Sequence, residues 1–155
     1  MGLNISLDYK NFDFSAYAFA SVGNEIVRNY ERNQNLTNWS VYFLDRWTGE
    51  GTSNTTPRVT TGANSNGLFS DYFVEDGGYV KLREVALSYT LPKGLLGDVF
   101  KDVKIGIIGR NLLTFTKYTG YDPEVAVADG SQYFGFDGFG YPNFTTFSGS
   151  IEFKF

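Results

Sequence analysis

The final nine residues, 147–155, alternate apolar and polar side chains without a break and stop on a phenylalanine. Successive side chains of a β-strand point to opposite sides, so Phe147, Gly149, Ile151, Phe153 and Phe155 fall on one face. Such a strand fits the wall of a transmembrane barrel, with lipid on one side and a wet lumen on the other. It equally fits an amphipathic strand of a soluble sandwich, so this segment alone leaves both structures open.

Four further segments show the same alternation, at residues 3–9, 12–21, 79–91 and 103–115. The connections between the five segments are alternately short and long: residues 10–11, 22–78, 92–102 and 116–143. In an antiparallel sheet this pattern places every long connection at the same end. Small turns at one end and large loops at the other are typical of outer-membrane barrels, whereas compact soluble domains seldom contain such long loops. The sequence therefore favours an antiparallel β-barrel wall.

Aromatic and charged residues follow the same alternation. Aromatic side chains lie on the apolar face beside the short connections, as an aromatic girdle requires: Tyr9, Phe12, Tyr89, Phe153 and Phe155. Charged residues take the opposite face: Asp8, Asp13, Glu84, Lys104, Arg110, Glu152 and Lys154. Lys81 and Arg83 break the pattern, because they share the parity of Val85 and Leu87. Either they reach the outer membrane interface along their stems, or a β-bulge near Glu84 shifts the register.

Composition excludes several classes of function. The chain has no cysteine and no histidine, so thiolate metal sites and the commonest metal ligand and general base are absent. We therefore expect no enzyme and no cofactor. A net charge of -4 with scattered basic residues argues against nucleic-acid binding. The carboxylate groups lack metal-loop spacing, and we interpret them as turns and solvated loop residues: Glu75 with Asp76, Asp122 with Glu124, and Asp129 with Asp137.

Aromatic residues gather in the two longest connections. In the first, Leu36, Trp39, Phe43 and Trp47 recur at three- and four-residue steps, which predicts one or two helical turns. Flat rings in external loops stack on sugars or pack on a partner, so the candidate ligand-binding residues are Trp39, Trp47, Tyr118, Tyr121, Tyr133 and Tyr141. Packing within the loops is the alternative, and we favour it because these rings are the main apolar content there.

Several motifs resemble one family in order and spacing. Residues 75–92, with the sequence EDGGYVKLREVALSYTLP, are similar to a late barrel signature of SusC/RagA-type TonB-linked outer-membrane proteins. Residues 109–118 with 120–124, GRNLLTFTKY and GYDPE, resemble the element that follows in that family. Arg46, Trp47 and Thr48 with Pro57 and Arg58 match its upstream loop, and Tyr141 and Pro142 precede the terminal strand as they do there.

The resemblance implies a fold and a function. The fold would be all-β, an antiparallel partial transmembrane β-barrel made of about the last five strands of a 22-stranded barrel, with long external loops. Residues 1–155 would form the C-terminal segment of the receptor barrel, without a plug domain. The function implied is uptake of oligosaccharides or peptides across the bacterial outer membrane.

The same resemblance implies partners. These are outer-membrane lipid, a SusD-like lipoprotein, the TonB complex acting through an N-terminal part absent from this chain, and the barrel assembly machinery, with Phe153 and Phe155 as the assembly signal. Two alternatives stay open: a soluble or surface β-sheet carbohydrate-binding module, and a segment of a porin that does not depend on TonB.

Overall fold

The structure is a computed structural model that describes residues 1–28, 41–59, 65–95, 100–124, 135–138 and 140–155. Strands dominate it: β1 (Gly2–Tyr9), β2 (Phe12–Ser21), β3 (Glu25–Arg28), β4 (Val74–Asp76), β5 (Tyr79–Thr90), β6 (Asp102–Thr116), β7 (Phe136–Asp137) and β8 (Thr146–Lys154). Three short 3₁₀ helices lie in the first long connection: η1 (Val41–Asp45), η2 (Ser65–Gly67) and η3 (Asp71–Phe73). Among the described residues, no helix has the length and apolar character needed to cross a membrane.

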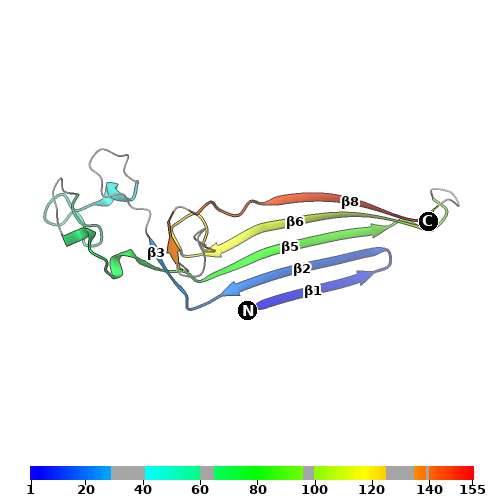
Figure 1. Cartoon of the computed structure of the whole chain (residues 1–155), viewed down its shortest axis with the longest axis horizontal. Helices are drawn as coiled ribbons and strands as arrows, with labels where there is room; N and C mark the ends of the chain where they lie inside the picture. Colours follow the sequence, from blue (N-terminus) through cyan, green and yellow to red (C-terminus); the bar gives the residue numbers. More distant parts are fainter. Residues whose placement is uncertain (29–40, 60–64, 96–99, 125–134, 139) are drawn as a thin grey trace.

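Five long strands form one antiparallel sheet in the order β1-β2-β5-β6-β8. They correspond to the five alternating segments of the sequence, which confirms the predicted strands. Lys10 turns the β1–β2 hairpin with a left-handed φ of 52°. The two shorter connections and the C-terminus lie at one end of the sheet, and the two long connections leave from the other (Figure 1).

The apolar face is continuous because the register places apolar residues opposite one another. Leu7 pairs with Phe14, Phe14 with Leu87, and Leu87 with Ile107. Side chains on this face stay open to their surroundings: Leu7 is 60% exposed and Ile107 62%. The hydrophobic residues that are buried within the described part of the chain are Ile26, Val103 and Tyr118, and none of them forms a layer over this face. The described residues therefore place no protein core against the apolar face.

The opposite face is polar along its length. Rows of paired residues cross the sheet, such as Asn4, Tyr17, Glu84, Arg110 and Thr146. All the charged residues expected on this face stand on it. The sheet is thus two-sided, with polar and apolar faces that are determined by the alternation of the sequence.

A β-bulge explains why Lys81 and Arg83 break the alternation. Tyr17 pairs with Glu84 but Ala18 pairs with Leu82, so Arg83 is an extra residue of β5 relative to β2. The irregularity grows on β6, where two residues, Asn111 and Leu112, lie opposite that single extra residue. Asn111 takes a φ of 51° there, and its amide donates to the carbonyl of Phe144 at 3.0 Å. The bulge alternative of the sequence analysis is therefore confirmed, and Lys81 lies on the polar face.

A small second sheet, in the order β4-β3-β7, forms between the long connections. Strand β3 pairs antiparallel with β4 and parallel with β7. Its arginine, Arg28, is buried, bonds Glu75 at 3.1 Å and donates to the carbonyl of Tyr72 at 2.7 Å. The sequence analysis did not predict this sheet, because strands of two to four residues carry no measurable period.

The helical segment expected around Trp39 and Phe43 is described only in part. Phe43 lies in η1, which is 3₁₀ and ends at Asp45, before Trp47. Leu36 and Trp39 lie outside the described residues. The Gly, Ser, Thr and Asn content of residues 49–67 predicts an irregular loop. Residues 49–59 contain no strand or helix, residues 60–64 lie outside the described residues, and residues 65–67 form η2, which was not predicted.

Candidate functional site: the polar face and its ion network

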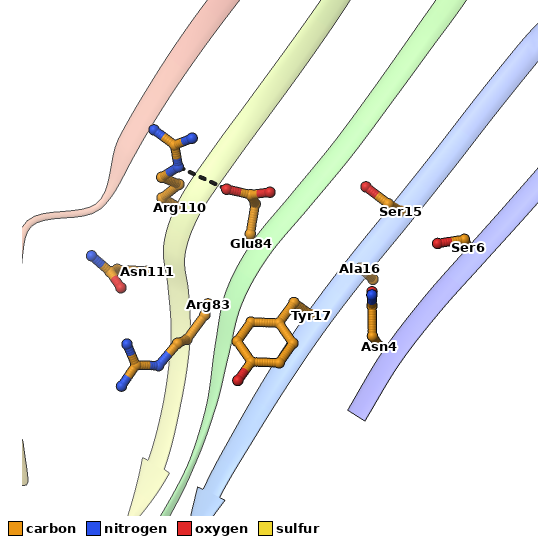
Figure 2. A pocket seen from close by; sticks show the side chains of 9 residues that line it. All are labelled: Asn4, Ser6, Ser15, Ala16, Tyr17, Arg83, Glu84, Arg110 and Asn111. Atoms are coloured by element: carbon orange, nitrogen blue, oxygen red, sulfur yellow. Dashed lines mark hydrogen bonds and ion pairs between the residues drawn. The ribbon is translucent and has the colours of Figure 1, made fainter. Parts of the chain in front are cut away.

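The polar face is hollowed at the bulge. Figure 2 shows this pocket, here called the wall pocket, with side chains from four neighbouring strands, β1, β2, β5 and β6. It has a volume of about 510 Å³ and is lined by Asn4, Ser6, Ser15, Ala16, Tyr17, Arg83, Glu84, Arg110 and Asn111. Apart from Ala16, which pairs with Ile5 and Val85 on the apolar face, each of these residues lies at a polar-facing position or at the bulge itself.

Two ion pairs connect neighbouring strands on this face. Arg110 Nε lies 2.8 Å from Glu84 Oε2 across β6 and β5, as marked in Figure 2. Lys104 Nζ lies 2.5 Å from Asp13 Oδ2, to which Ser88 also donates, at 3.3 Å. All four charged side chains are about half exposed, so water screens these pairs and their contribution to stability is small. They make the face hydrophilic and leave its charged groups within reach of a solute.

A buried ion network lies beside the wall pocket, where β5 meets the long connections. Its centre is Lys81, which is 1% exposed. Lys81 Nζ donates to Asp122 Oδ1 at 3.1 Å and to Glu124 Oε2 at 2.7 Å. Arg83 bonds the other oxygen of Glu124, and the hydroxyl of Tyr79 donates to that oxygen at 2.8 Å. We use "ion network" for Tyr79, Lys81, Arg83, Asp122, Glu124 and Asn143.

Asn143 closes the ion network from the segment that leads into β8. Its backbone N–H donates to Asp122 Oδ2 at 3.1 Å, and its side-chain amide donates to both Asp122 and Glu124 at 3.2 Å. Asp122 Oδ1 also accepts the backbone N–H of Glu124 at 3.0 Å, which makes a turn over Pro123. The ion network therefore ties the connection after β6 and the start of β8 to one lysine of β5.

The two loop carboxyls are kept ionised by these donors. Burial alone would raise the pKa of Asp122, but the backbone N–H groups of Glu124 and Asn143, together with Lys81, outweigh it and lower that pKa below 3.8. Burial likewise opposes ionisation of Glu124, and Lys81, Tyr79 and Arg83 overcome it, so the pKa of Glu124 is lowered below 4.5.

The sequence analysis missed this ion network. It interpreted Asp122 and Glu124 as turn and solvated loop residues, and the turn is confirmed, but solvation is wrong because Lys81 and Arg83 neutralise both carboxylates. Glu75 is likewise an ion-pair partner, of Arg28, whereas Asp76 makes the expected turn by accepting from Gly78 N–H at 2.8 Å. The available signal was the parity break at Lys81 and Arg83, two cations that needed partners.

The loop aromatics named as ligand candidates lie in different environments. Tyr118 is 5% exposed and its hydroxyl donates to buried Asp137, so its ring packs within the protein. Tyr121 and Tyr141 are 81% and 82% exposed, next to the ion network in sequence. Trp47 is 40% exposed at the edge of a loop hollow. Trp39 and Tyr133 lie outside the described residues. Ligand binding by any of these six stays a prediction.

Aromatic side chains gather at the end of the sheet with the short connections. Phe12 and Tyr89 have ring centroids 4.5 Å apart on the apolar face. Phe153 and Phe155 flank Phe100, at 5.2 and 5.4 Å. Phe100 was not predicted, because it precedes β6 in an irregular connection. The ring cluster matches the expected girdle in position, and the role of Phe153 and Phe155 as an assembly signal stays a prediction.

Within the described residues, the acidic side chains do not form a group of three or more that would hold a metal ion. The polar face offers paired charges, hydroxyls and amides, which suit reversible contact with a polar solute. A two-sided antiparallel sheet of this kind, with its long connections at one end, has the form of a section of outer-membrane β-barrel wall.

Comparisons with known proteins agree with that class. The chain is 35% identical over its whole length to TonB-dependent receptor P3 of Formosa agariphila. It is 29% identical, again over its whole length, to TonB-dependent receptor SusC of Bacteroides thetaiotaomicron. The chain spans 16% and 15% of the lengths of these two relatives. A comparison with protein-family models gives no match.

Solved structures show the same fold. The RagAB peptide importer in its open-open state superposes with a TM-score of 0.77 over 99% of this chain and 17% of that one, at 23% identity. A second structure, of the RagAB peptide transporter, gives the same TM-score over 98% of this chain at 24% identity. The chain belongs to the SusC/RagA family of TonB-dependent receptors. Its relatives are named as receptors and importers, not as enzymes.

Proposed function

We propose that this chain is the C-terminal barrel section, residues 1–155, of a TonB-dependent transporter in the bacterial outer membrane. The transporter takes up oligosaccharides or peptides together with a SusD-like lipoprotein. The plug and the segment that contacts the TonB complex belong to parts of the transporter outside this section. The barrel assembly machinery recognises the terminal strand through Phe153 and Phe155.

The exposed apolar face is the observation that carries the proposal. Leu3, Ile107 and Phe147 are 60%, 62% and 79% exposed, in a sheet whose other face holds the ion pairs. Water penalises such exposure by about 25 cal/mol for each Å² of apolar surface. Lipid removes that penalty, and it would add about 2–4 kcal/mol for a lysine or arginine at the bilayer midplane. The apolar face carries no lysine or arginine between residues 84 and 91 or between 103 and 109, which is the composition that lipid demands.

A soluble carbohydrate-binding module fits these observations poorly. Such a module buries its sheets against each other, whereas the apolar face here has no covering layer among the described residues. A porin would share the two-sided wall, so the wall alone does not favour a TonB-dependent transporter. The names of the relatives and the fold of the RagAB importer support the transporter.

Two neighbouring residues of β6 give a direct test. Ile107 pairs with Leu87 on the apolar face and Ile108 with Ala86 on the polar face. The test uses the parent protein, meaning the full transporter that contains this section, after any cysteines elsewhere in it are replaced. Because this section has no cysteine, a nitroxide label attached to Ile107→Cys or to Ile108→Cys then reports on one face at a time. In vesicles we expect the label at 107 to be accessible to oxygen and shielded from a polar nickel complex. Equal accessibility at both positions would rule out a lipid-facing wall.

Transport needs its own experiment. We expect the parent protein to fractionate with the outer membrane, to migrate differently on gels before and after heating, and to lose substrate uptake when TonB is deleted. Uptake that is independent of TonB would favour the porin, and recovery in soluble fractions would exclude both.

A further inference from the structure

The long connection between β2 and β5 contains a second pocket, which we call the loop pocket. Its volume is about 650 Å³, within the range of sites that hold small ligands. Residues from two parts of the connection line it: 47 and 53–58 from one part, and 65, 66, 68–70 and 72 from the other. The described parts of this connection lie beyond the end of the sheet from which the long connections leave (Figure 1). If that end is external, as proposed above, the loop pocket meets solutes before the wall pocket does.

Hydrogen bonds hold the walls of the loop pocket. The backbone N–H of Trp47 donates to the carbonyl of Thr56 at 2.9 Å, and Thr56 is buried. The N–H of Thr56 in turn donates to the hydroxyl of Ser53 at 3.1 Å. Across the pocket, the amide of Asn66 donates to the carbonyl of Arg58 at 3.3 Å. These contacts fix the position of the Trp47 backbone, so its ring borders the pocket from a fixed point.

The small sheet anchors the other wall. Arg28 of β3 donates to the carbonyl of Tyr72 at 2.7 Å and stacks its guanidinium 5.1 Å from the centre of the Tyr72 ring. Arg28 also bonds Glu75 of β4. The Tyr72 ring meets Phe73 edge-on at 5.0 Å. The loop pocket is therefore attached to a hydrogen-bonded sheet and is a built feature of the connection.

The lining combines flat rings with neutral polar groups. Trp47, Phe69 and Tyr72 supply the rings, and Phe69 is 70% exposed. Asn54 and Asn66 supply amides, and several serines and threonines supply hydroxyls. Arg58 is the single charged side chain in the described lining, which contains no carboxylate. A saccharide matches this set, because its C–H face packs on an aromatic ring while its hydroxyls exchange hydrogen bonds with amides and hydroxyls.

A peptide matches the lining less well. Proteins often bind extended peptides by adding a strand to a sheet edge, and none of the described lining residues belongs to a strand. The amino terminus of a peptide would need an acidic partner, and the described lining supplies none. We propose that the loop pocket binds the sugar rings of an oligosaccharide, an inference that rests on the transporter function and names its substrate class.

The test uses the intact parent protein, purified from outer membranes in detergent. Arrays of defined oligosaccharides and of short peptides identify what the protein binds, and calorimetry then measures the Kd of the tightest oligosaccharide for each variant. We expect Trp47→Ala and Phe69→Ala each to raise that Kd by about 10-fold or more. Trp47→Phe keeps a ring at the same position and should retain most of the affinity. Leu44→Ala is the matched control, since Leu44 is 75% exposed in the same connection and does not line the pocket.

Three outcomes would overturn the inference: no oligosaccharide bound, peptides bound in place of oligosaccharides, or an oligosaccharide Kd that neither alanine variant changes. Phe69 is largely exposed, so Phe69→Ala leaves the fold intact. If Trp47→Ala misfolds, Phe69→Ala still tests the pocket. Heat-modifiable migration verifies the barrel of every variant. A protein that stays in the outer membrane and imports in a TonB-dependent manner, but fails these binding tests, refutes the loop pocket and leaves the transporter standing.

Discussion

Replacing Lys81 by methionine should release the connection after β6 from the polar face. Methionine has nearly the same length and packs in the same space, so the change removes the charge and its three hydrogen bonds with little loss of volume. Asp122 and Glu124 would then be left mostly buried, with side-chain exposures of 12% and 14%, without their central cation.

The free-energy cost of Lys81→Met depends on the hydrogen-bond donors that remain around the two carboxylates. Removing one partner of a buried ion pair costs about 3–5 kcal/mol. Here Asp122 keeps its donors from Asn143 and Glu124, and Glu124 keeps Arg83 and Tyr79. These donors place the expected cost at the lower end, about 3 kcal/mol, for the local opening of this connection. That is roughly a 100-fold increase in the fraction of molecules with the connection open.

Hydrogen exchange and limited proteolysis of the membrane-inserted parent protein measure that opening. We expect faster exchange at residues 117–124 in Lys81→Met, with the strands β5 and β6 unchanged. Adding Glu124→Gln and Asp122→Asn removes the unpaired charges and should restore part of the protection. Arg110→Met is the matched control, because it breaks an ion pair that is half exposed and should change protection by less than about 1 kcal/mol. Equal exchange in Lys81→Met and the unaltered protein would refute the structural role of the ion network.

Three further results are expected. The pKa values of Asp122 and Glu124 are lowered in the folded protein, so their stabilising contribution is complete above about pH 4.5 and is lost as the pH falls through those lowered values. Protease resistance of the connection after β6 should therefore be the same at pH 8 and pH 5 and decline only below about pH 4. A Cβ at Gly77 would lie 2.6 Å from the amide nitrogen of the Asn24 side chain. Thermal unfolding should therefore show that Gly77→Ala destabilises the small sheet by about 1–3 kcal/mol. Gly149→Ala is the control and should be neutral, because a Cβ at Gly149 would meet open space. Deleting Phe155 from the parent protein should reduce the heat-modifiable barrel in outer membranes, and an unchanged amount would count against its role as an assembly signal.

The long strands were predictable from the sequence because alternation over eight or more residues specifies both strand and face. Alternation also excludes any slip of one residue in register, because such a slip would turn an entire strand over, and the observed row of Leu7, Phe14, Leu87 and Ile107 agrees with that. Closure of the barrel and its number of strands stay predictions from the family resemblance. Strands β3, β4 and β7 were out of reach because they are too short to show a period, and their pairing is set by contacts such as Arg28 with Glu75.

The ion network shows why a site is harder to predict than a strand. Lys81 lies 41 residues before Asp122 in the sequence, and no local pattern relates the two. The parity break at Lys81 indicated a cation that needed partners, but it did not indicate which residues those partners are. The sequence analysis placed Asp122 and Glu124 in solvent, because acidic residues beside proline and glycine usually occupy turns. In the structure Asp122 does both: it makes the turn and pairs with Lys81.

The bulge at Arg83 determines which change in length this wall tolerates. At the bulge, β5 has one residue, Arg83, that has no counterpart on β2, and β6 has two residues, Asn111 and Leu112, opposite Arg83. Deleting Arg83 would remove the extra residue and let β5 pair with β2 without a shift, so Lys81 would stay on the polar face and Leu82 on the apolar face. A single missing codon at this position would therefore remove the bulge and the ion pair of Arg83 with Glu124 but keep the two faces, whereas a codon lost from a regularly paired part of the strand would turn the residues beyond it over.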